Sequence, residues 1–491
     1  MRTVYLSPCH SLVGVHGDSV LVVSYPTVSV AHLTTSPLCI EHKESLMSAF
    51  TPDDNTPIES LDQLHSFMLA RCKNSDEWLI GTEHEKFGYS VNTGARPSFR
   101  GQIEELFLSF EREGWVTNRE LTPSGEEGDI ISLERDGANI TLEPGGQLEL
   151  SGAPLSSLEE MSNELDSHLE ELSFLSEPLG LIWSGLGTDP TPHGETPKMP
   201  KARYQVMRRY LHTKGSLALQ MMHSTSPIQT NLDYANEADA MRKLRAGLYL
   251  QPLVMGMFAN SFLLDGKLRD GNCARSNIWL NTDNDRYLYP AEWLDENTPL
   301  MNYVRWAIKT PMFFIARGGQ YIDCSGLPFE QFMRDGVKGH SPTMGDFELH
   351  LSTLFPDTRL KQHLEVRGAD MSSPDYVKAL SALHVGLMYD EQALDQTLSH
   401  FESTSAESLW RSRAEVDLQG LNTQLNGQSF QSHAEEILEI ARGGLSRREP
   451  ASVHLLDPVV WSIQRGESPA IRNRALWAEG YEALMRGTRL A

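Results

Sequence analysis

Two glutamates separated by one residue are the first candidates for chemistry in this sequence. They lie in the segment GTEHEKF (81–87). Side chains alternate between the two faces of a β-strand, so Glu83 and Glu85 would point the same way, roughly 6–7 Å apart at the backbone. Neighbouring carboxylates repel each other unless a cation lies between them. The pair therefore indicates a cation site, although taken alone it also fits a solvated strand face with salt bridges.

A second acidic pair flanks a glycine turn. The segment TLEPGGQLEL (141–150) places Glu143 and Glu149 on either side of Pro-Gly-Gly. Leu148 and Leu150 share one face of the strand that follows, so Glu149 faces the other side. Glycines at such a turn let a ligand approach the backbone closely. A surface hairpin with acidic decoration remains the alternative.

A third segment, HLEVRGAD (363–370), joins a carboxylate to a guanidinium. Alternation puts His363, Glu365 and Arg367 on one face of a strand. A carboxylate can hold a cation while the fork of an arginine clamps phosphate oxygens. The pattern indicates a metal-bound phosphate, and a structural ion pair is the open alternative.

Amide and cationic side chains occur in two more segments. SPIQTNL (226–232) is predicted as a strand with Gln229 and Asn231 on one face, and RSNIW (275–279) as a strand start that carries Arg275 and Trp279. Each could equally serve packing. They complete a set that could bind a small anionic substrate.

Several classes of protein are excluded by composition and by missing motifs. The formal net charge of −24 lacks the basic footprint that nucleic acids require. The sequence contains neither GxxxxGK[ST] nor GxGxxG nor GxSxG, which argues against P-loop, Rossmann and hydrolase sites. If ATP binds, carboxylate-held metal ions and a few arginines must supply the positive charge.

The five cysteines are scattered and form no CxxC pair, which is typical of reduced thiols rather than a disulfide framework or a zinc site. Apolar runs are too short for a transmembrane helix. We therefore expect a cytoplasmic protein without a membrane or nucleic-acid partner.

The N-terminal region differs from the rest of the chain. Residues 1–50 are rich in Ser, Thr, Val and His, and Asp18 is the only acidic residue before Glu41. Neither a strong signal peptide nor an arginine-rich transit peptide is evident. We expect a poorly ordered extension over 1–50, with Met47 as an alternative start, and a catalytic domain over 51–491.

The elements that must position these residues alternate irregularly. Strands are predicted over 78–91, 129–133, 139–143 and 147–150, and Asp136-Gly137 predicts a hairpin turn. Helices are predicted over 158–175 with a capping box at 156–159, over 203–211 after Pro200, and over 237–264 with a kink at Pro252. The region beyond 375 is mainly helical. The class is therefore α+β with an antiparallel sheet.

At these residues the sequence resembles glutamate–cysteine ligases of the plant and proteobacterial type, within the glutamine-synthetase-like carboxylate–amine ligases. The resemblance is carried in order by GTEHEKFGY (81–89), ITLEPGGQLELSGAP (140–154), MPKARYQVMRRYL (199–211), QTNLDYANEADAMRKLRAGLYLQP (229–252), RSNIWLNTDNDR (275–286) and HLSTLFPDTRLKQHLEVRGAD (350–370). It implies a curved antiparallel sheet that forms a funnel, flanked by helices, with a helical C-terminal part.

The resemblance also implies an activity. Glutamate, cysteine and ATP would be the substrates and Mg²⁺ the cofactor, in the first step of glutathione biosynthesis. The γ-carboxylate of glutamate attacks the γ-phosphorus of ATP, and the cysteine amine then displaces phosphate from γ-glutamyl phosphate. An alternative keeps the fold but uses another amine acceptor, and a protein that only senses these ligands is a third reading. The protein would be a monomer or a homodimer.

Residue roles follow from the matching motifs. The resemblance implies Mg²⁺ ligands at Glu83, Glu85, Glu143, Glu149 and Glu365, and Arg367 as the catalytic group that stabilises the transferring phosphoryl group together with Glu365. Substrate contacts are implied at Gln229, Asn231, Arg275, Trp279, Arg203 and Tyr204. We expect Glu365→Ala to abolish turnover without unfolding the chain.

Cys324 resembles a regulatory cysteine of the plant proteins, but the segment 337–341 holds no partner thiol. We therefore expect activity to be independent of a disulfide.

Overall fold

The structure is a computed structural model that describes residues 54–122, 124–192 and 196–491. These residues belong to one compact unit. The predicted extension over 1–50 lies outside the described residues. Among the residues that are described, Cys72, Cys273 and Cys324 are free thiols.

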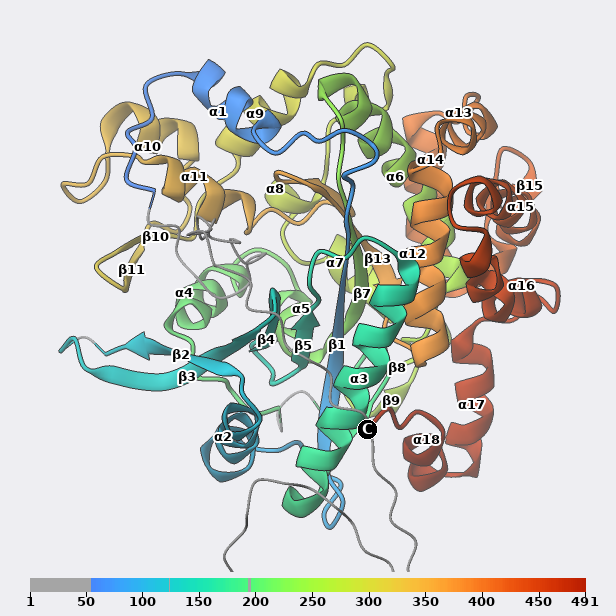
Figure 1. The fold of residues 1–491 in the computed structure, drawn as a ribbon, viewed down its shortest axis with the longest axis horizontal. Coiled ribbons are helices and arrows are strands. Elements are labelled where there is room, and N and C mark those ends of the chain that lie inside the picture. The colour runs from blue at the N-terminus through green and yellow to red at the C-terminus, as the bar shows by residue number, and fades with distance from the viewer. Residues whose placement is uncertain (1–53, 123, 193–195) are drawn as a thin grey trace, which may run out of the picture. The chain divides into compact units, whose positions relative to one another are not determined.

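A nine-stranded sheet runs through the middle of this unit (Figure 1). Its strands follow the order β12-β13-β7-β1-β5-β4-β3-β2, and β6 pairs with the second half of β1. All of these strand pairings are antiparallel, and among the described residues β12 and β2, at the two ends of the order, do not pair with each other. The predicted α+β class with an antiparallel sheet is confirmed. The bounds of the strands are β1 (Ile80–Ser90), β2 (Val116–Leu121), β3 (Glu127–Arg135), β4 (Ala138–Leu142), β5 (Leu148–Ser151), β6 (Leu181–Ser184), β7 (Pro227–Leu232), β12 (Thr358–Leu360) and β13 (Leu364–Asp370).

The predicted hairpin between β3 and β4 is confirmed. Asp136 and Gly137 have φ angles of 52° and 88°, and two consecutive left-handed residues make the tight turn that matches the twist of paired strands. Short hairpins β8–β9 (Leu263–Leu264, Lys267–Leu268), β10–β11 (Phe314–Arg317, Gln320–Asp323) and β14–β15 (Gln424–Leu425, Gln428–Ser429) lie outside the sheet.

Helix α3 (Leu158–Ser176) covers the predicted range, but its capping differs from the expected box. Ser157 is the N-cap, and its hydroxyl accepts a hydrogen bond from Glu160 N. The carboxylate of Glu160 accepts from the backbone and hydroxyl of Ser156. The N-cap is therefore Ser157 and not Ser156, because Ser157 has the extended backbone of an N-cap and directly precedes the first helical residue, Leu158.

Helix α6 (Glu237–Met257) ends seven residues before the predicted limit at 264. Asn260 stops it, because its side-chain amide donates to the carbonyls of Gly185 and Met371. The backbone N–H of Asn260 also donates to a carboxylate oxygen of Asp370. These contacts turn the chain toward β8 in place of another helical turn.

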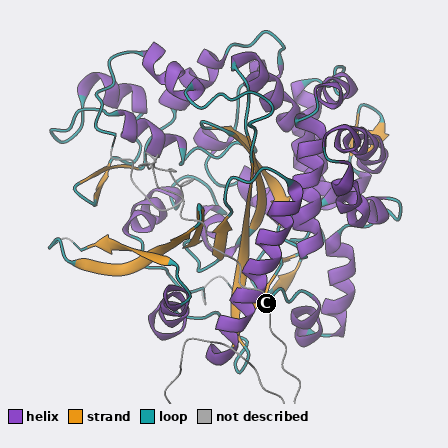
Figure 2. Cartoon of the chain, in the orientation of Figure 1, coloured by secondary structure: helices purple, strands orange, loops and turns teal. Residues whose placement is uncertain are grey.

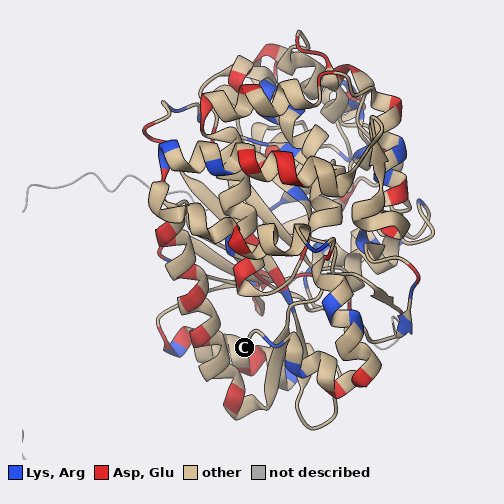
Figure 3. Cartoon of the chain, turned by 90° about the vertical axis from the view of Figure 1, so that its right-hand side faces the viewer, with Lys and Arg blue, Asp and Glu red and all other residues tan. Residues whose placement is uncertain are grey.

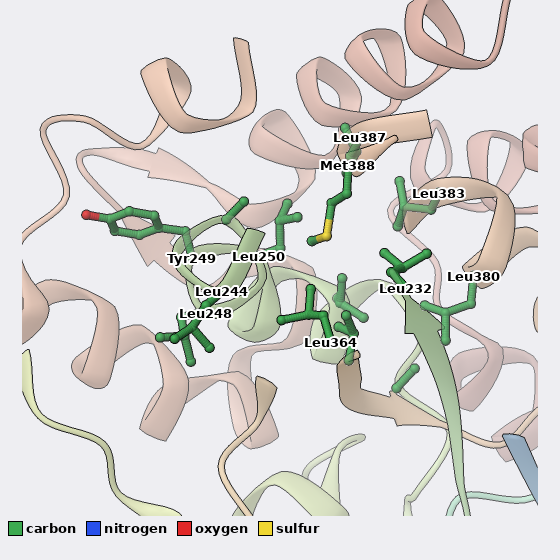
Figure 4. Close-up of a cluster of buried hydrophobic side chains, with 14 of the residues drawn as sticks. Leu232, Leu244, Leu248, Tyr249, Leu250, Leu364, Leu380, Leu383, Leu387 and Met388 are labelled. Carbon is green, nitrogen blue, oxygen red and sulfur yellow. The ribbon is translucent and has the colours of Figure 1, made fainter. Parts of the chain in front are cut away.

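Helices cover one face of the sheet, and the core lies between. Leu232 on β7 and Leu364 on β13 pack with Leu380 and Leu383 of α12 (Pro374–Met388). Figure 4 shows these side chains pointing toward one another, with Leu244 of α6 in the same cluster. The strands therefore present their other face, which carries the polar side chains, to the opposite side.

The C-terminal region is mainly helical, as expected (Figure 2). In the described part of the chain, no helix has the length and apolar character needed to span a membrane. Acidic positions are spread over the helices of the side shown in Figure 3 and form no single patch. The α-helices not given above or below are α1 (Leu61–Leu69), α2 (Glu104–Arg112), α8 (Asn284–Tyr287), α9 (Leu300–Lys309), α10 (Phe329–Asp335), α11 (Met344–Leu351), α13 (Glu391–His400), α14 (Ala406–Gln419), α15 (Phe430–Arg448), α16 (Asp457–Ile463), α17 (Pro469–Glu479) and α18 (Tyr481–Gly487).

Candidate active site

The strand register gathers acidic side chains on one face of the sheet. Glu85 on β1 lies directly opposite Glu149 on β5, and Glu83 lies opposite Gln229 on β7. Directly opposed residues of antiparallel strands project to the same face. Because β1 lies between β5 and β7, it joins the two predicted acidic segments into one row.

The row continues across the next strands. Asn231 on β7 lies opposite Glu365 on β13, and its amide nitrogen donates to Glu83 at 2.8 Å. Arg367 follows Glu365 by two residues and donates to Gln229 at 2.7 Å. The third predicted segment therefore meets the first through the two amides of β7.

One pocket collects ten of the twelve predicted site residues: Glu83, Glu85, Glu143, Glu149, Arg203, Tyr204, Gln229, Arg275, Trp279 and Arg367. The other two, Asn231 and Glu365, do not line it, but each is hydrogen-bonded to a residue that does. An apolar wall of the same pocket is formed by Met207, Met221, Met222, Phe314, Leu349 and Phe355.

The pKa values of the carboxylates on β1 and β5 are raised, because the effects of burial and of neighbouring carboxylates exceed that of the nearby positive charge. Burial and then the neighbouring Glu143 raise the pKa of Glu149 to about 8. The same two causes, with Glu149 added, raise the pKa of Glu85 well above its usual range. Burial also raises the pKa of Glu83, with Glu365 contributing. Buried carboxylates that repel one another take up protons or cations.

Glu365 is in the opposite situation. It is fully buried, and Arg359, which lies opposite it on β12, donates to both of its oxygens at 2.7 Å. Lys361 lies 2.9 Å away, and Arg367 is also bonded to it. Burial alone would raise the pKa of Glu365, but the three cations together hold it well below its usual range.

The donor chemistry of this pocket fits a hard divalent cation. Oxygen ligands from carboxylates are what Mg²⁺ prefers, and three of the carboxyl groups have pKa values that are raised by burial and then by neighbouring carboxylates. Within the described ranges, however, no three His, Cys, Asp or Glu side chains are gathered closely enough to enclose an ion.

The turn between β4 and β5 depends on glycine. A Cβ on Gly145 would lie 2.3 Å from the carbonyl oxygen of His223, which belongs to α5 (Ala218–Ser224). Gln147 fixes the same contact, because its amide accepts from Gly145 N and donates to Thr225 O at 2.7 Å. The turn that separates Glu143 from Glu149 is thus held directly against α5.

Arg275 and Trp279 lie on a helix, α7 (Ala274–Leu280), so the predicted strand is wrong. Arg275 caps the backbone of β13 by donating to the carbonyls of Arg367 and Gly368, at 2.8 and 3.0 Å. Ile278 and Trp279 are buried, which satisfies their apolar character without a strand. Arg275 Nε and Trp279 Nε1 have no partner among the described residues, and both side chains line the pocket.

Arg203 and Tyr204 enter from α4 (Ala202–Leu211), the helix predicted after Pro200. The Tyr204 hydroxyl donates to Leu142 O at 2.6 Å, beside Glu143. Lys201 is buried immediately before the helix, and burial, followed by the adjacent Arg203, lowers its pKa to about 7. Arg203 therefore brings positive charge to the pocket that Glu143 and Glu149 also line.

Sequence reasoning overlooked four residues of the site: Arg359, Lys361, Gln147 and Lys201. All four lie inside the motifs quoted for the resemblance. Arg359 could have been found as the residue that an antiparallel β12–β13 pair places opposite Glu365. No local pattern distinguishes the other three.

Comparison with known proteins agrees with this geometry. The model of glutamate–cysteine ligase family 2 matches residues 79–478. A chloroplastic glutamate–cysteine ligase from Brassica juncea is 40% identical over 414 residues, 83% of this chain and 79% of the relative. One from Medicago truncatula is 39% identical over 425 residues, 85% of this chain and 82% of the relative.

A solved structure shares the fold. The glutamate–cysteine ligase of Francisella tularensis in complex with AMP superposes with a TM-score of 0.52 at 12% identity, over 84% of this chain and 87% of that one. At this identity the likeness concerns the fold, and it agrees with an open antiparallel sheet flanked by helices.

The relatives also correct one expectation and confirm another. They are named as chloroplastic proteins, so the expected cytoplasmic location is not supported and is withdrawn. The five scattered cysteines are typical of many compartments in which thiols stay reduced, and they could not decide between them. The resemblance carried by the motifs is confirmed: the chain belongs to glutamate–cysteine ligase family 2.

Proposed function

We propose that this protein is an ATP-dependent ligase that joins the γ-carboxylate of glutamate to the amine of cysteine, the first step of glutathione biosynthesis. Membership of the family supports the reaction. The observation that carries the proposal is the single pocket in which four glutamates face Arg367, Arg275 and Arg203. Such a pocket suits two anionic substrates that must approach each other.

Magnesium is the proposed cofactor, held by Glu83, Glu85, Glu143 and Glu149, with Glu365 as the fifth predicted ligand. When bound, it would neutralise charge on the polyphosphate and so lower the repulsion between ATP and glutamate. The raised pKa values of Glu85 and Glu149 support this assignment, because burial and neighbouring carboxylates make their charged forms unfavourable without a cation. Glu365 differs, since its charge is already matched by three cations.

Cationic side chains at the β12–β13 end suit the phosphoryl group. Arg367, Arg359 and Lys361 line the pocket, and Glu365 fixes all three. A preorganised guanidinium stabilises charge that develops on a transferring phosphoryl group. As a glutamate oxygen bonds to the γ-phosphorus, the bond to the ADP oxygen breaks, and Arg367 would balance the charge that develops.

The substrates are proposed to meet between α7 and α4. Arg275 and Trp279 would bind the α-carboxylate and backbone of glutamate through their unpartnered N–H groups. Arg203 and Tyr204 would bind cysteine, whose amine attacks the acyl carbon and expels phosphate. The apolar wall with Met207, Met221 and Met222 offers soft contacts for a thiol.

Phosphate release tests the activity directly. Purified protein with ATP, Mg²⁺ and glutamate should release phosphate with cysteine and little with other small amines. Glu85→Gln should reduce turnover by at least about 100-fold, while Glu439→Gln, an exposed helical position, should leave it unchanged. Release with a different amine alone would favour the other acceptor class, and no release with any amine would refute a ligase.

A further inference from the structure

A second pocket lies between α4 and α5 and has no role in the chemistry above. Thr196, Lys198, Arg208, Arg209, His212, Leu219 and His223 line it, and we call it the α4–α5 basic pocket. None of these residues lines the main pocket. Five of the seven can carry positive charge and none is acidic, in a chain whose net charge is −24.

Two polar atoms of this pocket are buried and have no partner in the described chain: one terminal nitrogen of Arg208 and the hydroxyl of Thr196. A buried donor without an acceptor is unfavourable, and more so when it is charged. Burial lowers the pKa of Arg208, with only Tyr204 opposing this effect. The half-buried guanidinium is thus partly desolvated, and no carboxylate contributes to its pKa.

The neighbouring cations are only partly neutralised. Arg209 is bonded to Asp323 at 3.0 Å, and the two side chains are 61% and 39% exposed. An ion pair that is this accessible to solvent neutralises little of the positive electrostatic potential around it. Lys198 is exposed at the rim, and His212 follows the last turn of α4.

The geometry points to a binding site for a phosphate group in the α4–α5 basic pocket. Four side chains of this pocket carry N–H or O–H donors: Arg208, Thr196, Lys198 and His212. Together they have more donors than the two oxygens of one carboxylate can accept. A phosphate offers three or four oxygens. Arginine and lysine together are the usual recognition groups for such an anion. The phosphate could be free or part of a nucleotide, and the chemistry of recognition is the same.

The position of this pocket connects it with the main one. Arg208 lies on the same helix as Arg203 and Tyr204, and His223 lies on the same helix as Met221 and Met222. Met199 N, one residue after Lys198, donates to Pro144 O at 3.2 Å in the turn between Glu143 and Glu149. An anion would therefore bridge two helices that line the main pocket and a segment that is hydrogen-bonded to the turn between Glu143 and Glu149.

Calorimetry with three variants tests the site: Arg208→Met, Lys198→Ala and the control Arg411→Met, which removes an exposed arginine of α14. In one arm, inorganic phosphate is titrated into protein already saturated with glutamate, Mg²⁺ and a non-hydrolysable ATP analogue. In the other arm, the analogue is titrated into protein without phosphate. The readout is heat of binding, so it does not depend on which amine the enzyme uses.

Phosphate should bind in the first arm, and Arg208→Met should weaken it by at least about tenfold. Lys198→Ala should weaken it less, and Arg411→Met not at all. Weakening by the two pocket variants in the second arm alone would assign the site to the phosphates of a nucleotide. Equal binding by wild type, Arg208→Met and Lys198→Ala in both arms would overturn the proposal. If Arg208→Met failed to fold, the exposed Lys198→Ala would decide.

Discussion

The two ends of the carboxylate row solve the same electrostatic problem in opposite ways. On β1 and β5, Glu85 and Glu149 are buried beside other carboxylates, and their pKa values are raised. On β13, Glu365 is just as deeply buried, but Arg359, Lys361 and Arg367 surround it and its pKa is lowered. At the first end, the negative charge of the carboxylates is left for a ligand to neutralise. At the second end, side chains of the protein already neutralise the charge of Glu365. Burial alone thus does not identify a ligand site, because the partners decide.

Among the variants that test this comparison, the one that removes the carboxylate of Glu365 should have the largest effect on stability. Glu365→Ala leaves two arginines and a lysine without the buried carboxylate that they share, and breaking such an arrangement costs about 3–5 kcal/mol of unfolding free energy. Denaturant unfolding measures this loss, and turnover should also disappear. This revises the expectation, drawn from the sequence, that the variant would remain folded. A midpoint equal to that of wild type would show that Glu365 is not an internal counter-ion.

Glu149→Gln should have a smaller and opposite effect on stability without metal. A carboxyl group whose pKa rises from 4.5 to about 8 on folding favours the folded state at low pH and loses that contribution as the pH rises through 8. The thermal midpoint of the variant should therefore exceed that of wild type increasingly between pH 5 and pH 8 in EDTA.

Saturating Mg²⁺ should reverse this order, because only wild type retains the ligand. Glu439→Gln, at an exposed position, provides the matched control and should show no pH-dependent difference. A constant difference between Glu149→Gln and wild type across this pH range would contradict the raised pKa and weaken the contrast with Glu365.

Lys361→Met should have the smallest effect. Arg359 already donates to both oxygens of Glu365, so removing one of three cations leaves the carboxylate paired. We expect a loss of about 1 kcal/mol or less, measured by denaturant unfolding, together with a several-fold higher KM for ATP. A loss as large as that of Glu365→Ala would mean that the three cations act as one unit.

Local patterns pointed to the four glutamates of the candidate pocket because strand alternation is a local property. Glu83 and Glu85 share a face whatever their neighbours are, and the hairpin at Asp136-Gly137 pairs β3 with β4, the strand that ends just before Glu143. What alternation cannot give is the order of the strands. The proximity of Glu83 to Glu365 depends on β7 lying between β1 and β13, which joins segments almost 300 residues apart.

The missed residues have physical reasons of the same kind. Strand β12 spans only Thr358–Leu360, too short for a pattern to single out Arg359. The helix that carries Arg275 was predicted as a strand because Ile278 and Trp279 favour strands, a preference that depends strongly on context. Here the contacts of Arg275 with β13 decide the local structure.

The close contact between Gly145 and His223 has a consequence for how substitutions distribute over this chain. Gly145 has no side-chain functional group, but its lack of a Cβ lets the turn between β4 and β5 lie against α5. A saturation screen for growth should find position 145 as intolerant as the acidic positions, with alanine already failing. Such a result would identify an architectural requirement that chemical reasoning about side chains cannot reveal.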